Sequence, residues 1–245
     1  MPIRTDRRTR FSERHLALAG LGAPAVLVLG VMVAGLTWPG YSHRTQHISD
    51  LGGIEAPYPA LLNGTLVLFG LLVVAYSPAL HQGLPRRAHP RASPLLVGYF
   101  GVAAVVQGLT PCTPGCAAGT TADLLHGLAA TTGILAVAGG MLSDWRDTRS
   151  VAARSSHGTL SAWTGALTLG FLVAWLIATG VDPQRLHAGA LQRSLIAVVL
   201  IWLTATAVQL RRPTHRTDSD STRTDEMTVP PDAVTFMARV PRGFR

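Results

Sequence analysis

Six long apolar stretches, separated by short polar segments, constrain this chain more than any other feature. A helix needs about 20 apolar residues to cross the hydrocarbon core of a bilayer. Lipid offers no hydrogen bonds to the backbone, so such a stretch satisfies its own peptide groups best as a helix. The predicted spans are residues 16–38, 58–80, 94–109, 122–142, 160–180 and 189–210. The sequence therefore predicts an all-α, polytopic transmembrane bundle of six helices.

Composition agrees with a membrane protein. The 245 residues are 48% hydrophobic and only 14% charged, whereas soluble domains carry about 25% charged residues. The net charge of +8 does not indicate nucleic acid, because the basic residues flank the apolar spans and no basic face with interleaved aromatic residues is present. Membrane lipid is the predicted partner. Nucleic acid is not expected as a partner, no cofactor is expected, and the sequence identifies no protein partner.

The distribution of arginine predicts the orientation. Arginines gather before the first span and after the second, fourth and sixth spans, whereas the opposite segments carry only Arg44 and Arg185. Basic residues favour the cytoplasmic side, so both termini are predicted to be cytoplasmic, in the plasma membrane of a bacterium. The predicted parts are a basic N-terminal tail (1–15), the six-helix domain (16–210) and a disordered cytoplasmic tail (211–245), whose composition is polar.

The segment after the first span is rich in side chains that can do chemistry. Polar groups at a membrane boundary often mark a site, which makes His47, Ser49 and Asp50 candidate catalytic residues. If His43 and His47 lie on one helical turn, they could share a metal, but a third ligand would have to come from Asp50, His126 or His187. We expect no metal. Alternatively, Ser49 and Asp50 form a structural turn, because both residue types hydrogen-bond readily to nearby backbone.

More polar residues are predicted at the same membrane depth. Asp123 and His126 are three residues apart, on one face of the fourth span, and are further catalytic candidates. The structural alternative is an acidic residue stabilised at a helix N-terminus. Asn63 in the second span, and Gln192 and Arg193 in the sixth, are candidate binding residues. Together these positions predict a single polar pocket near the outer leaflet.

The two cysteines lie in the turn Pro111-Cys112-Thr113-Pro114-Gly115-Cys116. Oxidising conditions outside the cytoplasm favour a disulfide between Cys112 and Cys116, and the Pro and Gly residues permit a tight turn. A redox-active pair or a two-cysteine metal site is less favoured, because the spacing is not C-x-x-C and no second ligand pair is present.

Several of these motifs, in this order, resemble the family called domain of unknown function 998, a set of six-span bacterial and archaeal membrane proteins. The resemblance covers residues 16–210. It rests on Ile48-Ser49-Asp50-Leu51-Gly52, Asn63, the cysteine turn, His126-Gly127 and Gln192-Arg193. The Ile-Ser-Asp element also resembles the Frag–DRAM–Sfk membrane proteins, some of which are linked to lipid remodelling. Family members often carry an acidic residue in the cysteine turn. This chain has Thr113 there, which weakens any metal or acid–base role for that loop.

Two functions remain open from the sequence. The first is a non-enzymatic role in lipid binding, transport or as an accessory subunit. The alternative is a membrane-embedded lipid hydrolase or transferase, in which a histidine acts as base, an aspartate orients it, Ser49 attacks and Arg193 holds a phosphate. No G-x-S-x-G, H-E-x-x-H or nucleotide-binding loop is present, which favours the non-enzymatic role.

Overall fold

The computed structural model describes residues 6–81, 92–117, 119–149, 155–181 and 187–211. These residues form helices and connecting loops, with no strand among them, which confirms the predicted all-α fold. The long helices are α1 (Asp6–Leu36), α2 (Pro59–Tyr76), α3 (Ala92–Leu109), α4 (Thr121–Thr148), α5 (Ser155–Val181) and α6 (Ala188–Arg211). Three short 3-10 helices are η1 (Ser49–Gly52), η2 (Ser77–His81) and η3 (Pro114–Cys116).

Six helical segments are long and apolar enough to cross a membrane, as predicted. The helices extend furthest beyond the predicted spans at α1, which begins at Asp6, at α4, which continues to Thr148, and at α5, which begins at Ser155. Residues 82–91, 150–154, 182–186 and 212–245 are outside the described residues. Much of the arginine pattern and the predicted C-terminal tail fall there, so the orientation of the chain stays a prediction.

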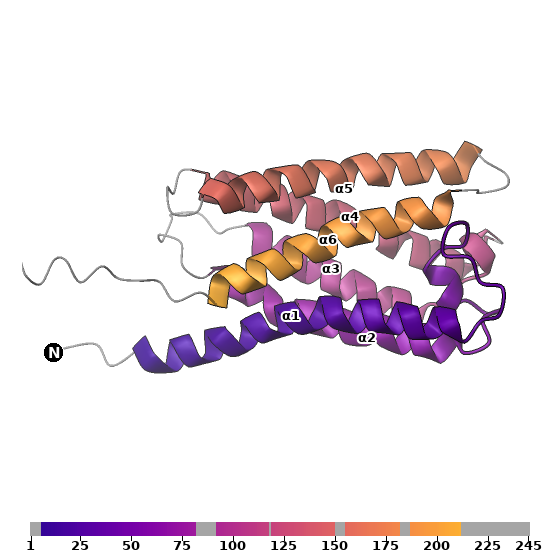
Figure 1. Cartoon of the computed structure of the whole chain (residues 1–245), viewed down its shortest axis with the longest axis horizontal. Coiled ribbons are helices and arrows are strands. Elements are labelled where there is room, and N and C mark those ends of the chain that lie inside the picture. Colours follow the sequence, from indigo (N-terminus) through magenta and orange to yellow (C-terminus); the bar gives the residue numbers. More distant parts are fainter. Residues whose placement is uncertain (1–5, 82–91, 118, 150–154, 182–186, 212–245) are drawn as a thin grey trace, which may run out of the picture. The chain divides into compact units, whose positions relative to one another are not determined.

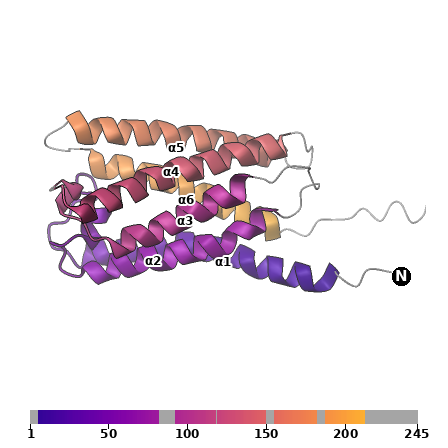
Figure 2. The ribbon, with the colours of Figure 1, turned by 180° about the vertical axis from the view of Figure 1, so that it is seen from behind.

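The six helices of residues 6–211 form a closed ring. Each long helix packs against the next one in the chain, and α6 packs against α1. In Figure 1, α6 and α1 face the viewer below α5, and Figure 2 shows α4, α3 and α2 from behind. The interior of the ring is filled largely by apolar side chains, of which the largest fully buried ones are Trp202, Tyr76 and Phe69. The ring therefore has one apolar interior shared by all its helices.

The outer surface of the ring is also apolar. Leu29 of α1 is 62% exposed, Leu95 of α3 is 72% exposed and Ile201 of α6 is 58% exposed. Exposing so much apolar surface to water is unfavourable, at roughly 25 cal/mol per Å². These side chains instead suit contact with lipid, as expected of a helix bundle within a bilayer.

Helices α2 and α3 approach each other closely because glycine lies at their crossing. A Cβ atom on Gly70 would overlap the carbonyl oxygen of Gly101, and one on Gly101 would crowd the carbonyl oxygen of Gly70. Small residues permit this kind of backbone contact, which supports helix association in lipid.

Two loops meet at one end of the ring, which we call the loop end: there α1, α3 and α5 end and α2, α4 and α6 begin. The first loop joins α1 to α2 and contains η1, and the second joins α3 to α4 and contains η3. The backbone N–H of Ile54 donates a hydrogen bond to the carbonyl of Cys112 across the two loops, at 3.1 Å. The loop end contains all the site residues predicted from the sequence.

Candidate functional site

The first loop lies directly on the beginning of α6. Gly189 makes this possible, because a side chain there would overlap the carbonyl oxygen of Gln46. The backbone N–H of Ala190 donates to the carbonyl of Arg44 at 2.9 Å. The side-chain oxygen of Gln192 accepts a hydrogen bond from the backbone N–H of Ile48 at 2.6 Å. Gln192, a predicted binding residue, therefore holds the loop in place.

Arg193 anchors the same loop. Its Nη1 donates to the carbonyl oxygens of Gln46, at 2.9 Å, and of Gly189, at 3.0 Å. Its Nη2 donates to the Tyr41 hydroxyl at 2.6 Å, and that hydroxyl donates in turn to the carbonyl of His47 at 2.6 Å. Burial raises the pKa of Tyr41, and the Arg193 guanidinium opposes that shift. The predicted phosphate-binding arginine thus makes its described hydrogen bonds to the protein itself.

His43 and His47 contact different neighbours. The segment between them is not helical. The ring of His43 meets the edge of Tyr41, and partial burial, together with Arg193, lowers the pKa of His43. His47 is buried, packs edge-on against Trp175 and places Nδ1 3.8 Å from Oδ2 of Asp50. The helical turn on which these two histidines would share a metal is absent from this described segment.

Asp50 ties the two loops together. Its Oδ2 accepts a hydrogen bond from the backbone N–H of His47 at 2.7 Å, and its Oδ1 accepts one from the backbone N–H of Gly115 at 2.8 Å. Asn63 of α2 supports η1 by donating to the carbonyl of Gly52 at 2.9 Å. Asp50 therefore has a structural role in the turn, as in the alternative given for Ser49 and Asp50, and Asn63, a predicted binding residue, bonds to the same 3-10 helix.

Asp123 caps α4 and holds the cysteine turn. Its Oδ2 accepts from the N–H and hydroxyl of Thr120, at 3.0 and 2.8 Å, and the Thr120 hydroxyl accepts from the N–H of Asp123. This reciprocal pair is a capping box. The other carboxylate oxygen of Asp123, Oδ1, accepts hydrogen bonds from the N–H and hydroxyl of Thr113, at 2.8 and 3.0 Å. Asp123 thus stabilises the N-terminus of α4, which is the structural role named above as the alternative to catalysis.

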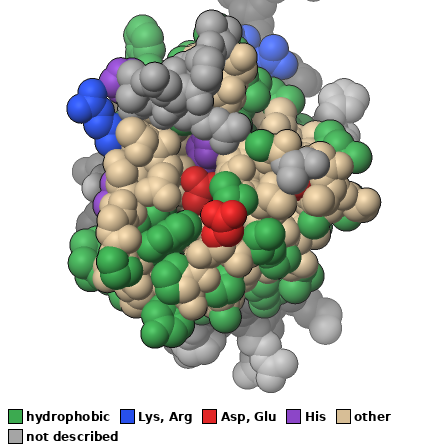
Figure 3. Space-filling model, turned by 90° about the vertical axis from the view of Figure 1, so that its right-hand side faces the viewer, with side chains coloured by type: hydrophobic (Ala, Val, Ile, Leu, Met, Phe, Trp, Pro, Cys, Tyr) green, Lys and Arg blue, Asp and Glu red, His purple; other side chains and the backbone are tan. Residues whose placement is uncertain are grey.

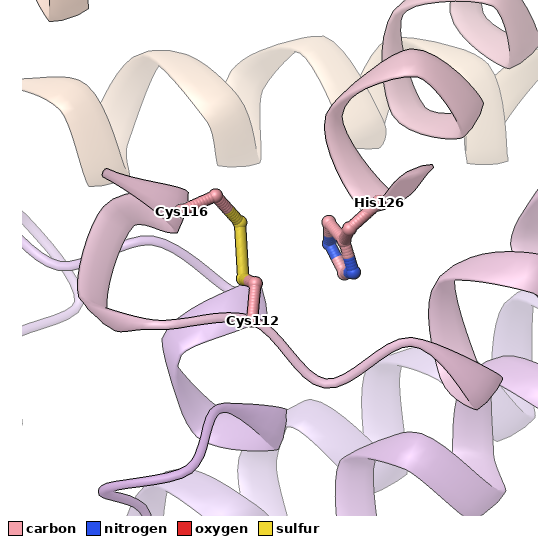
Figure 4. Close-up of side chains that lie close together, drawn as sticks. All are labelled: Cys112, Cys116 and His126. Atoms are coloured by element: carbon pink, nitrogen blue, oxygen red, sulfur yellow. A yellow bond between two sulfur atoms is a disulfide. The ribbon is translucent and has the colours of Figure 1, made fainter. Parts of the chain in front are cut away.

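His126 is buried one turn further along α4, and its Nδ1 lies 3.0 Å from the carbonyl oxygen of Thr110. A carbonyl only accepts, so Nδ1 carries the hydrogen and Nε2 of the neutral ring keeps its lone pair. Beside this ring, the predicted disulfide between Cys112 and Cys116 is present, with the Cα atoms 5.1 Å apart (Figure 4).

Three cavities surround these residues. The largest, of about 620 Å³, lies between α4, α5 and the two loops, and a smaller one of about 70 Å³ lies inside the ring. They share four lining residues: Gln107, Ala130, Trp175 and Gln192. A third hollow, of about 260 Å³, includes Asp50 and Glu55 at the loop end, where acidic side chains are visible near the middle of that face (Figure 3).

The largest cavity brings together some of the predicted residues but not others. Its lining includes Cys116 and five of the candidate catalytic and binding residues: His47, Ser49, Asp123, His126 and Gln192. Asp50 lines the third hollow instead. Asn63 and Arg193 are bonded to the loops and line none of the three cavities. Ser49 lines this cavity together with His47 and His126, and the hydrogen bonds described above join it to neither.

A second polar cluster, which the sequence analysis missed, lies at the opposite end of the ring. Oδ2 of Asp144 in α4 is 2.9 Å from Nε2 of His157 in α5, and it accepts a hydrogen bond from Ser161 at 2.8 Å. The Ser161 hydroxyl accepts from the indole N–H of Trp202 in α6 at 2.9 Å. All four side chains are buried. The sequence offered one indication of this cluster: Ser161 follows His157 by four residues, which places both on one face of a helix.

The fold and these contacts define an integral membrane protein with six apolar helices and a polar network at each end of a closed ring. A family model described as a protein of unknown function (DUF998) matches residues 21–209. The chain belongs to this family, as its motifs predicted. No curated protein and no solved structure matches the chain. The remoter resemblance to the Frag–DRAM–Sfk proteins finds no support in these comparisons.

Proposed function

We propose that this membrane protein is a non-enzymatic lipid-binding protein. One observation carries the proposal: the largest cavity, whose surface is mainly apolar but includes polar residues at the loop end, shares four lining residues with an apolar cavity inside the ring. The inner cavity is lined by residues of all six helices, among them Leu27, Leu66, Phe100, Ile134, Leu172 and Leu195. We propose that the head group lies among the polar residues and that only a short part of the apolar chain enters the small cavity inside the ring.

The polar lining favours an uncharged head group. His47, Gln107, His126 and Gln192 line the largest cavity and offer hydrogen bonds to hydroxyl or carbonyl groups. Asp123 lines the same cavity and would repel a phosphate. Among the described lining residues there is no arginine, and Arg193 already bonds to carbonyl oxygens of the loop. The head group is therefore a neutral one that carries hydroxyl or carbonyl oxygens.

The proposed orientation places the loop end outside the cytoplasm. The arginine pattern puts both termini inside the cell, and a disulfide is favoured in an oxidising compartment. The ligand would then enter from the outer leaflet of a bacterial plasma membrane, between α4 and α5.

The lipid hydrolase or transferase is the alternative, and one observation favours it: Ser49, His47 and His126 line the same cavity. Against it, both candidate carboxylates bond to backbone amides or threonines of the loops, and Oδ2 of Asp50 lies 3.8 Å from Nδ1 of His47, beyond hydrogen-bond length. A Ser49→Ala variant tests this alternative. It should leave the cellular lipid composition as in the parent strain. A lipid profile equal to that of a deletion strain, at normal protein levels, would instead support the enzyme.

The binding proposal is tested by filling the shared part of the two cavities. An Ala130→Phe variant places an aromatic ring there, whereas Leu125→Phe adds a ring on α4 at an exposed position outside both cavities. Each purified protein is labelled with a photoreactive diacylglycerol and, separately, with a photoreactive phosphatidylglycerol. We expect diacylglycerol labelling that Ala130→Phe lowers at least about tenfold and Leu125→Phe leaves unchanged. Equal labelling of both variants contradicts the proposal, and a preference for phosphatidylglycerol contradicts the neutral head group.

A further inference from the structure

Three side chains with metal-binding atoms gather beside the largest cavity. A sulfur of Cys112, a sulfur of Cys116 and a ring nitrogen of His126 all lie within 4.8 Å of one another. The cysteines belong to the turn between α3 and α4, and His126 belongs to α4 itself (Figure 4). In the structure the two sulfurs form a disulfide, so they are not ligands in this state.

We propose that reduction of this disulfide converts the cluster into a zinc site formed by Cys112, Cys116 and His126. Two thiolates and an imidazole are a donor set that zinc prefers, and three protein ligands leave a fourth position open. The site goes beyond the proposed lipid binding and does not depend on it.

The hydrogen bond of His126 already gives its ring the tautomer that a metal ligand needs. Its Nδ1–H donates to the Thr110 carbonyl, which leaves the lone pair on Nε2. Histidines that bind metals usually donate their second N–H to a backbone carbonyl or a carboxylate in this way. The ring is thus held in the tautomer that can bind an ion through Nε2.

Hydrogen bonds hold the turn that carries the cysteines in addition to the disulfide. Thr113 donates two hydrogen bonds to Asp123, and the N–H of Gly115 donates one to Asp50. None of these three bonds involves a sulfur atom, so we expect them to keep both thiols beside His126 when the S–S bond is broken. Side chains alone then have to move to bring the sulfurs around an ion.

The cluster is open to the largest cavity. Cys112 is 1% exposed, whereas Cys116 and His126 line the largest cavity. A small dithiol can therefore attack the Cys116 sulfur from the cavity, and an ion can enter by the same route. The fourth coordination position, held by water, would face this cavity.

The chemistry balances with a dithiol as reductant. The dithiol supplies two electrons and two protons, becomes a cyclic disulfide, and leaves Cys112 and Cys116 as thiols. Binding of Zn²⁺ then displaces the two thiol protons, so the site forms more readily as the pH rises.

The test uses the full chain in detergent, without oxygen, after treatment with dithiothreitol and removal of the reagent. Co²⁺ is added as a coloured substitute for Zn²⁺, and thiolate-to-cobalt absorption in the near ultraviolet is recorded. We expect this absorption to saturate at a single ion per chain in the reduced protein and to disappear when Zn²⁺ is added. The wild-type protein with its disulfide intact is the control and should show no thiolate-to-cobalt absorption.

Three variants distinguish a specific metal site from nonspecific metal binding. Cys112→Ser/Cys116→Ser should abolish the thiolate absorption. His126→Gln should weaken the affinity at least about tenfold, and His187→Gln, which changes an exposed histidine in the loop before α6, should leave it unchanged. Absence of the absorption in the reduced wild-type protein overturns the proposal. Equal affinity in His126→Gln and wild type overturns it as well.

Discussion

Asp50 and Asp123 hold the cysteine turn from two sides. Each carboxylate uses Oδ2 for its own segment and Oδ1 for the turn, where Asp50 accepts from Gly115 and Asp123 accepts from Thr113. Hydrogen bonds to an ionised group contribute roughly 1.5–3 kcal/mol each. The turn is thus fixed by charge-assisted hydrogen bonds as well as by its disulfide.

Replacing Asp50 by asparagine should destabilise the protein, because the new amide nitrogen cannot accept the hydrogen bond that one carboxylate oxygen accepts. We expect the free energy of unfolding to fall by about 1–3 kcal/mol, measured as a lower Tm in detergent. Glu55→Gln is the matched control, because it removes the same charge from an exposed side chain of the same loop. If both variants melt at the same temperature, Asp50 does not have this role.

The sequence located these residues but left their roles open. Ser49 and Asp50 fitted both a turn and a catalytic pair, since the same side chains serve both purposes. The choice depends on a backbone N–H that lies 65 residues away in the chain, at Gly115. Every non-proline residue offers such a donor, so composition and spacing carry no signal for it.

At the scale of the helices, the crossing of α2 and α3 depends on the absence of side chains at Gly70 and Gly101. A Gly70→Ala substitution forces the two backbones apart, and overpacking of this kind costs about 1–3 kcal/mol. The measurement is again the Tm in detergent. Gly64→Ala is the control on the same helix, because a Cβ atom there meets nothing within 4 Å. A Gly70→Ala protein as stable as Gly64→Ala would show that the helices can separate freely.

The buried cluster at the opposite end joins three helices, α4, α5 and α6, through Asp144, His157, Ser161 and Trp202. Asp144→Ala removes the shared acceptor and leaves His157 buried without its carboxylate. Leaving a buried hydrogen-bond donor without its acceptor typically costs about 1–3 kcal/mol. We expect a corresponding loss of stability on thermal unfolding, and little change in Arg146→Ala, which alters an exposed residue of the same turn. A loss as small as that of the control would contradict the assigned role.

The helices themselves were predictable because apolar length is a strong signal in a membrane protein. The cluster of Asp144 and His157 was missed for the same reason. A hydropathy pattern ends a span where charged residues begin, so the fourth and fifth spans were predicted too short. Asp144 and His157 bond to each other, so α4 and α5 can include them without leaving either side chain unpaired. A hydropathy profile contains no information about such pairs.

At the scale of the whole molecule, the proposed orientation can be measured in living cells. A single cysteine is introduced at Glu55, at the loop end, or at Arg146, near the opposite end, in a Cys112→Ser/Cys116→Ser background. Glu55→Cys should react with a membrane-impermeant maleimide in intact cells. Arg146→Cys should react only after permeabilisation, because its end carries the cytoplasmic arginines. The reverse pattern would invert the topology.

The ring closes only where α6 meets α1, the one pair of adjacent helices that no loop joins. If the helices insert in chain order, α1 to α5 form an incomplete ring first, and lipid can occupy its interior. The arrival of α6 completes the enclosure, and Arg193 and Gln192 then bind the loop that follows α1. Arg193 and Gln192 thus stabilise the closed ring at a late step of membrane insertion. A nascent chain truncated before α6 should consequently be a substrate for membrane quality control.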